Sequence, residues 1–126
     1  MAIKPVVLVI EDNAELRHVL KEALSAEGYH VLTARDEADA LEQLRANEVH
    51  LLISDLTNPP DATDEANVIQ TEFPELPIVA LQGATRAHPA FFFAAWGSSG
   101  RYRTIPKPFR LGELLAVSRD VLGVAS

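Results

Sequence analysis

Cysteine is absent from this sequence, and its absence excludes several kinds of chemistry at once. The chain can form no disulfide, no thiolate metal site and no cysteine nucleophile, which fits a reducing compartment. The histidines follow no metal-ligand spacing, and no glycine-rich phosphate loop follows a strand. We therefore interpret His18, His30, His50 and His88 as surface or strand residues.

Long apolar runs and an excess of basic residues are also missing. No apolar run approaches the length needed to span a bilayer, and the N-terminus lacks the three-part pattern of a signal peptide. The net charge of -7 argues against a general nucleic-acid binder. With 126 residues and 48% apolar content, we expect one cytoplasmic domain over residues 1–126, without a membrane or a direct nucleic-acid partner.

What the chain does contain is an alternation of strand and helix patterns. Short apolar runs bounded by turn residues predict strands over 5–10, 29–34, 49–55, 77–81 and 102–105. Periodicity and stop signals predict five helices. The first ends at Gly28, the second begins at Asp36 and the third spans 64–73. The fourth begins near Pro89, and the fifth covers 111–122. Asn13 or Asp12 should cap the first helix. The apolar face of that helix is predicted to contain Leu16, Val19, Leu20, Ala23 and Leu24.

Acidic residues follow two of the predicted strands. Glu11 and Asp12 come directly after the first strand, and Asp55 ends the third. Five strands alternating with five helices indicate an α/β domain, with a parallel sheet covered on both faces. If the first and third strands are neighbours, the three carboxylates converge at the carboxyl edge. That arrangement requires the doubly wound, flavodoxin-like order 2-1-3-4-5.

Three carboxylates at one sheet edge repel one another unless a cation or a proton neutralises them. Hard oxygen ligands with room for water are what a magnesium ion takes. A single strand-end aspartate can equally well cap the following helix, but three acids at two strand ends favour a site. The sequence therefore predicts an Mg²⁺ site formed by Glu11, Asp12 and Asp55.

Three motifs, in order, resemble the response-regulator receiver domain of two-component signalling: VVLVIEDN, LLISDLTNP and KPF. The resemblance implies that Asp55 accepts a phosphoryl group from a histidine kinase or phosphotransfer protein, and that Lys107 reaches the phosphoryl oxygens. It implies that Glu11, Asp12, Asp55 and the backbone carbonyl of Thr57 hold Mg²⁺. In-line attack on phosphorus needs such a nucleophile, metal and cation. A receiver catalyses only its own phosphorylation and dephosphorylation, and the sequence names no downstream partner.

Two residues depart from the usual pattern of the family. Gln82 ends the fourth strand where Thr or Ser is usual, and Thr104 stands where Tyr or Phe is usual. These positions form the switch of the family, in which a hydroxyl moves toward the phosphoryl group and an aromatic ring turns inward. Gly83 and Ala84 continue the loop beside the phosphoryl position. We expect phosphorylation to be weakly coupled to the usual switch.

Aromatic residues gather in the predicted fourth helix, at Phe91, Phe92, Phe93 and Trp96. Three consecutive phenylalanines cannot share one helical face, so at least one should face outward. Two interpretations stay open. In the first, these rings form a surface for a partner, or for a homodimer through the face from the fourth helix to the fifth strand. In the second, the long loop folds back and buries them.

Two rival functions come from other classes. A phosphatase of the haloacid dehalogenase type also starts from a strand-end aspartate, but it requires a second aspartate two residues on, where this chain has Thr57. A receiver-like interaction module that signals without phosphorylation is the more serious alternative, because Gln82 and Thr104 alter the switch. Retention of the acid pair, Asp55 and Lys107 favours the phosphoacceptor.

Overall fold

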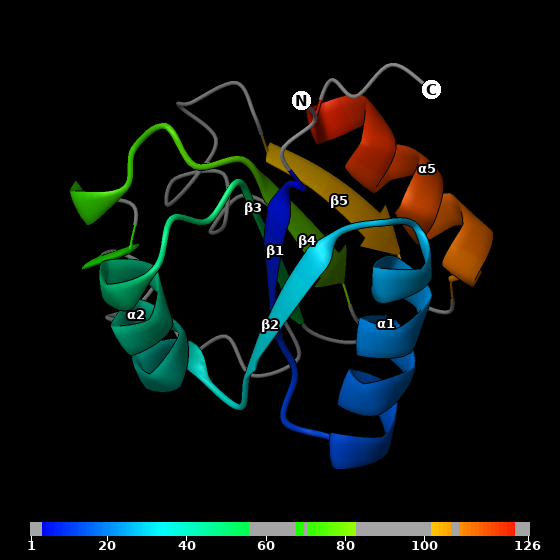
Figure 1. The fold of residues 1–126 in the computed structure, drawn as a ribbon, viewed down its shortest axis with the longest axis horizontal. Helices are drawn as coiled ribbons and strands as arrows, with labels where there is room; N and C mark the ends of the chain where they lie inside the picture. The colour runs from blue at the N-terminus through cyan, green and yellow to red at the C-terminus, as the bar shows by residue number, and fades with distance from the viewer. Residues whose placement is uncertain (1–3, 56–67, 70, 83–101, 107–108, 123–126) are drawn as a thin grey trace.

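The computed structural model describes residues 4–55, 68–69, 71–82, 102–106 and 109–122, and within them helices lie on both sides of one sheet (Figure 1). The elements are β1 (Val6–Ile10), α1 (Ala14–Ala26), β2 (His30–Ala34), α2 (Glu37–Ala46), β3 (Leu51–Asp55), β4 (Ile78–Gln82), β5 (Tyr102–Pro106) and α5 (Leu111–Leu122). Of the helix predicted over 64–73, the described residues 68–69 and 71–72 are helical. The helix predicted from Pro89 lies outside the described residues. None of the described helices has the length and apolar character needed to cross a membrane.

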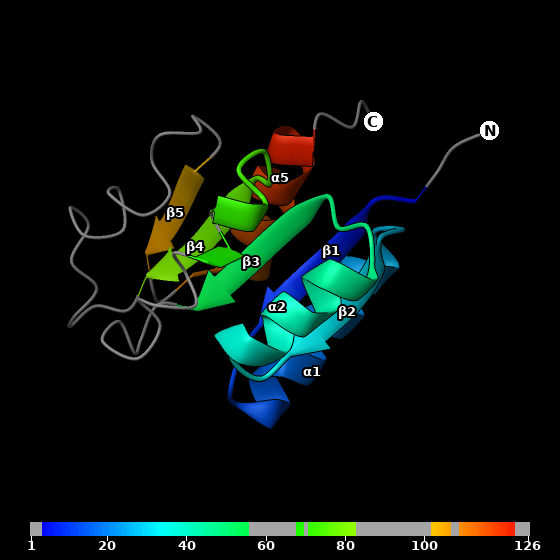
Figure 2. The ribbon, with the colours of Figure 1, turned by 90° about the vertical axis from the view of Figure 1, so that its left-hand side faces the viewer.

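The strands form a parallel sheet in the order β2-β1-β3-β4-β5, which is the order that the sequence predicts. β1 pairs on both sides, with Val9 opposite Thr33 of β2 and opposite Ile53 of β3. β5 lies at an edge, in agreement with its more polar sequence. Figure 2 shows the arrowheads of β1, β3, β4 and β5 pointing toward the same end of the sheet. Their carboxyl ends therefore share one edge.

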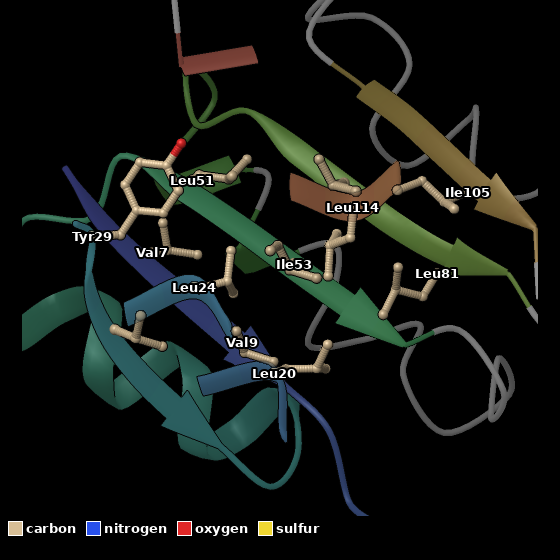
Figure 3. Packing of buried hydrophobic residues seen from close by; sticks show 12 residues of the cluster. Val7, Val9, Leu20, Leu24, Tyr29, Leu51, Ile53, Leu81, Ile105 and Leu114 are labelled. Carbon is tan, nitrogen blue, oxygen red and sulfur yellow. The ribbon is translucent and has the colours of Figure 1, made fainter. Parts of the chain in front are cut away.

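Successive side chains of the central strands enter two separate apolar clusters, because side chains alternate between the faces of a sheet. The α2-side core contains Leu8, Ile10, Ala34, Ala40, Leu44, Leu52, Ile69, Leu76 and Ile78. The α1/α5-side core (Figure 3) contains Val7, Val9, Leu20, Leu24, Tyr29, Val31, Leu51, Ile53, Val79, Leu81, Ile105 and Leu114. Burial on both faces explains why β1 and β3 are continuous apolar runs rather than alternating ones.

α1 begins as the sequence predicts, but one of its apolar residues faces solvent. Asn13 is the N-cap, and its side chain accepts a hydrogen bond from the Leu16 amide at 2.9 Å. Leu20 and Leu24 are fully buried, whereas Val19 is 44% exposed. The prediction that Val19 packs inward is therefore wrong. The pair four residues apart, Leu20 and Leu24, defines the buried face, and the residue before Leu20 is rotated from it by about 100°.

Gly28 ends α1 by its backbone conformation. Its φ is +96°, a left-handed backbone value that residues with a Cβ atom rarely adopt. No atom lies within 4 Å of the position that a Cβ would take. The requirement for glycine is therefore conformational rather than steric.

Tyr29 and an ion pair join α1 to α5 at the amino edge of the sheet. The Tyr29 ring is 8% exposed and belongs to the α1/α5-side core (Figure 3). Arg119 of α5 donates a 2.8 Å hydrogen bond to Glu27, the C-cap of α1. Burial raises the pKa of the Tyr29 phenol; Arg119 lowers that pKa, and Glu27 raises it.

We predict that ionisation of Tyr29 lowers the stability of the protein in alkali. Because the folded state raises the pKa of Tyr29, its contribution to stability is fully present below the unfolded pKa of about 10. That stability is lost as the pH rises through the folded value. Tyr29→Phe keeps the ring but removes the titrating group. Urea unfolding at neutral and alkaline pH should show a smaller loss in this variant than in the wild type. Equal losses in the two proteins would contradict the prediction.

His50 extends the pairing of β1 with β3 by one residue at the amino edge. Its amide donates to the Val6 carbonyl at 2.8 Å, and its Nδ1 accepts from the Val6 amide at 2.9 Å. The side chain thus takes the place of a strand carbonyl. We predict that His50→Ala lowers the free energy of unfolding by about 1 kcal/mol, because the Val6 amide loses this acceptor.

His30→Ala is the matched control for that measurement. His30 is exposed on β2, and its hydrogen bond to the Pro5 carbonyl is made by its backbone amide. Urea denaturation should therefore show a clearly smaller loss for His30→Ala than for His50→Ala. A loss at position 50 no larger than at position 30 would be evidence against a structural role for the imidazole.

Candidate functional site

The carboxyl edge of the sheet brings together the backbones of the acidic residues that the sequence singles out. Ile10 of β1 is opposite Ser54 of β3. The next residue in each segment is an acid, Glu11 just after β1 and Asp55 at the end of β3, so their backbones lie side by side at this edge. Asp55 is in turn opposite Leu81 of β4. The parallel register therefore places the backbones of these two acids next to each other.

Glu11 is a buried acid with a fixed backbone and a fixed side chain. It is only 2% exposed, and its amide donates to the Ala34 carbonyl of β2 at 3.0 Å. Its Oε2 accepts a 3.1 Å hydrogen bond from the Asn13 amide. A carboxylate held at the carboxyl end of a strand presents the hard oxygen that a small divalent cation takes.

Asp12 follows Glu11 in the turn between β1 and α1, and it is exposed to solvent. It stands between Glu11 and Asn13, the N-cap of α1. The amino end of a helix carries a partial positive charge, which favours acids beside it. Glu11 is thus buried at this edge, whereas its neighbour Asp12 is accessible to solvent.

Arg17 also lies at this edge, although its role could not be predicted from the sequence. Its Nη1 donates to the Glu11 carbonyl at 2.8 Å, and its amide donates to the Asn13 carbonyl at 2.9 Å. The signal in the sequence is a basic residue in the first turn of the helix that follows an acid pair. That spacing alone does not distinguish a hydrogen bond to the backbone from an ordinary surface charge.

The predicted switch residues lie at two levels of the sheet. Gln82 is the last residue of β4 and is opposite Pro106, whereas Thr104 is opposite Ala80, two residues further from the carboxyl edge. The structure describes the backbones, but not the side chains, of Asp55, Gln82 and Thr104. The remaining predicted site residues lie outside the described residues: Thr57, Gly83, Ala84, Lys107, Phe91, Phe92, Phe93 and Trp96.

The residues at this edge fit a small divalent cation by their chemistry. Glu11 and Asp12 supply hard carboxylate oxygens, one buried and one open to water, as magnesium prefers. Within the described part of the chain, no group of three or more acids, histidines and cysteines is placed to hold a metal ion. The third carboxylate in the predicted set is that of Asp55.

The sequence is similar to known regulators over most of its length. It is 33% identical to the DNA-binding transcriptional regulator NtrC of Rhizobium meliloti over 113 residues, which are 88% of this chain and 22% of that protein. It is 31% identical to the response regulator MprA of Mycobacterium ulcerans, over 92% of this chain and 49% of that protein. The chain thus spans about a fifth to a half of the length of these relatives.

The fold is similar to that of solved receiver domains. The receiver domain of NtrX from Brucella abortus superimposes with a TM-score of 0.77 at 27% identity, covering 94% of this chain and 99% of that one. A response regulator from Thermotoga maritima gives a TM-score of 0.78 over 97% of this chain. The family model described as the response regulator receiver domain matches residues 7–119. This chain therefore belongs to the family of response regulator receiver domains.

Proposed function

We propose that this chain is a phosphoacceptor receiver domain in which Asp55 takes a phosphoryl group from a histidine kinase or a histidine phosphotransfer protein. Receiver domains of response regulators interact with such proteins. The observation that carries the proposal is the register of β1 with β3, which sets the buried Glu11 beside Asp55. A nucleophilic carboxylate next to a cation-binding acid pair is the arrangement that phosphoryl transfer needs.

In the proposed transfer, a carboxylate oxygen of Asp55 attacks the phosphorus of a phosphohistidine. A new O–P bond forms, the N–P bond breaks, and the donor imidazole leaves with the electron pair. Water later attacks the phosphorus of the acyl phosphate, which breaks the bond to Asp55, releases inorganic phosphate and restores the carboxylate. Lys107 supplies a compact positive charge for the phosphoryl oxygens. The chain therefore acts as an acceptor and not as an enzyme with a separate substrate.

Receiver domains generally bind Mg²⁺ at the phosphorylation site. In this chain the residues to hold it would be Glu11, Asp12, Asp55 and the backbone carbonyl of Thr57. When bound, the metal neutralises negative charge on the acids and the phosphoryl group. The part of Glu11 is to present a buried oxygen in a fixed position, and that of Asp12 is to offer one from the solvent side.

We further propose that residues 1–126 form one receiver domain that works in the cytoplasm through protein partners, without direct contact with nucleic acid or membrane. A homodimer through the face from the fourth helix to β5 is one candidate assembly. A phosphorylation-independent interaction module remains the second candidate function, because Gln82 and Thr104 depart from the usual switch. The buried Glu11 supports the phosphoacceptor, since a docking module has no need to bury an acid at this edge.

Replacement of the acceptor tests the proposed function directly. Asp55→Asn should abolish the hydroxylamine-sensitive phosphoryl group that acetyl phosphate and Mg²⁺ place on the wild type, because an amide oxygen cannot form the acyl phosphate. Intact mass before and after hydroxylamine gives the readout. Asp120→Asn is the control, since Asp120 is an exposed residue of α5 that pairs with Arg103, and it should be labelled like the wild type. Labelling that survives Asp55→Asn would disprove the assignment.

The altered switch predicts a local response to phosphorylation. A charge-assisted hydrogen bond made in only one state contributes about 1.5 to 3 kcal/mol, so its loss reduces a population shift by about ten-fold or more. With beryllofluoride and Mg²⁺, amide chemical shifts should change around Asp55, Gln82 and Lys107 but little across 85–105. In the double variant Gln82→Thr with Thr104→Tyr, the changes should spread into that segment. Large changes there in the wild type would rule out weak coupling.

A further inference from the structure

We propose that Arg17 is a positioning residue that holds the acid pair ready for its cation, an inference that rests on the proposed function. Its guanidinium reaches back from α1 to the Glu11 carbonyl at 2.8 Å. Three other described arginines pair with surface carboxylates, Arg45 with Glu72, Arg103 with Asp120 and Arg119 with Glu27. Arg17 instead donates to the main chain, at the point where β1 becomes the loop carrying the acids.

The Arg17 bond is one of four hydrogen bonds that hold the turn between β1 and α1 in place. The Arg17 amide donates to the Asn13 carbonyl at 2.9 Å, and the Asn13 amide donates to Glu11 Oε2 at 3.1 Å. The Leu16 amide donates to Asn13 Oδ1 at 2.9 Å. The side chain and the carbonyl of Glu11 are thus both anchored to the first turn of the helix, and Arg17 provides the carbonyl anchor.

Asp12 depends most on this anchor. The Glu11 carbonyl and the Asp12 amide belong to one planar peptide unit, so a bond to that carbonyl restricts how the plane can turn. The amide on the other side of Glu11 is already held by the Ala34 carbonyl. With Arg17 in place, the exposed Asp12 lies between two fixed neighbours, Glu11 and Asn13. Its carboxylate therefore has less conformational freedom to lose when a cation binds.

The charge of Arg17 has the opposite effect on a cation, and this difference makes the role testable. A guanidinium close to the acid pair repels Mg²⁺, so its removal would strengthen binding if charge alone mattered. Loss of the anchor would weaken binding, because outer residues that orient metal ligands typically change affinity by about 10- to 100-fold. The sign of the change in Mg²⁺ affinity thus separates positioning from simple electrostatics.

Arg17→Met keeps a long helix-forming side chain and removes both the charge and the donor. We expect the dissociation constant for Mg²⁺ alone, measured from amide shifts during a magnesium chloride titration, to rise about ten-fold in this variant. Lys21→Met is the matched control: it removes one positive charge from an exposed position of α1, one turn further along, and should bind Mg²⁺ as tightly as the wild type or slightly more tightly. The free energy of unfolding without metal should change little in either variant.

Two results would overturn the role of Arg17: equal or tighter Mg²⁺ binding in Arg17→Met, or a loss of affinity equal to that in Lys21→Met. If Arg17→Met does not fold, Arg17→Leu gives the same comparison, since it also removes the charge and the donor. A wild type that binds no Mg²⁺ would instead contradict the proposed function. Failure of the positioning role and failure of the phosphoacceptor role therefore give different results.

Discussion

The pairing of β1 with β3 is the constraint on which the rest of this structure depends. It is the contact where the strand order turns from β2-β1 to β3-β4-β5, and in open α/β sheets such a point is where ligands bind. The register sets Ile10 opposite Ser54, which puts Glu11 beside Asp55. A shift of one residue would separate these acids and would also exchange the two apolar cores, because alternate side chains enter opposite faces. The same pairing thus holds the fold and brings together the backbones of the candidate site.

The site and the elements that secure the fold lie at opposite edges of the sheet. At the carboxyl edge, Glu11 and Arg17 make hydrogen bonds in the turn that follows β1. At the amino edge, His50 bonds to β1, and Arg119 joins α5 to the end of α1. Changes at the amino edge should therefore act mainly on stability, whereas the proposed chemistry belongs to the carboxyl edge.

The sequence predicts most of this fold because its strongest signals are local. The apolar run that becomes β3 and the cap residue Asn13 act within a few residues, and the acid motifs select the strand order. Val19 shows the limit of periodicity, since spacing alone does not say where an apolar stripe ends. Arg17 and His50 could not have been predicted as contacts, because each depends on a side chain meeting a main-chain group whose place the tertiary structure sets.

The position of β5 has a consequence for self-association. An edge strand offers unpaired amide and carbonyl groups to any other extended chain, and soluble proteins counter this with charges and prolines. β5 carries Arg103, which is exposed and paired with Asp120, and it ends in Pro106, which has no amide hydrogen to donate. A second chain approaching β5 would meet a charged side chain and a strand end that lacks one amide donor. Among the described residues, these features of β5 oppose the edge-to-edge pairing that begins fibrous aggregation.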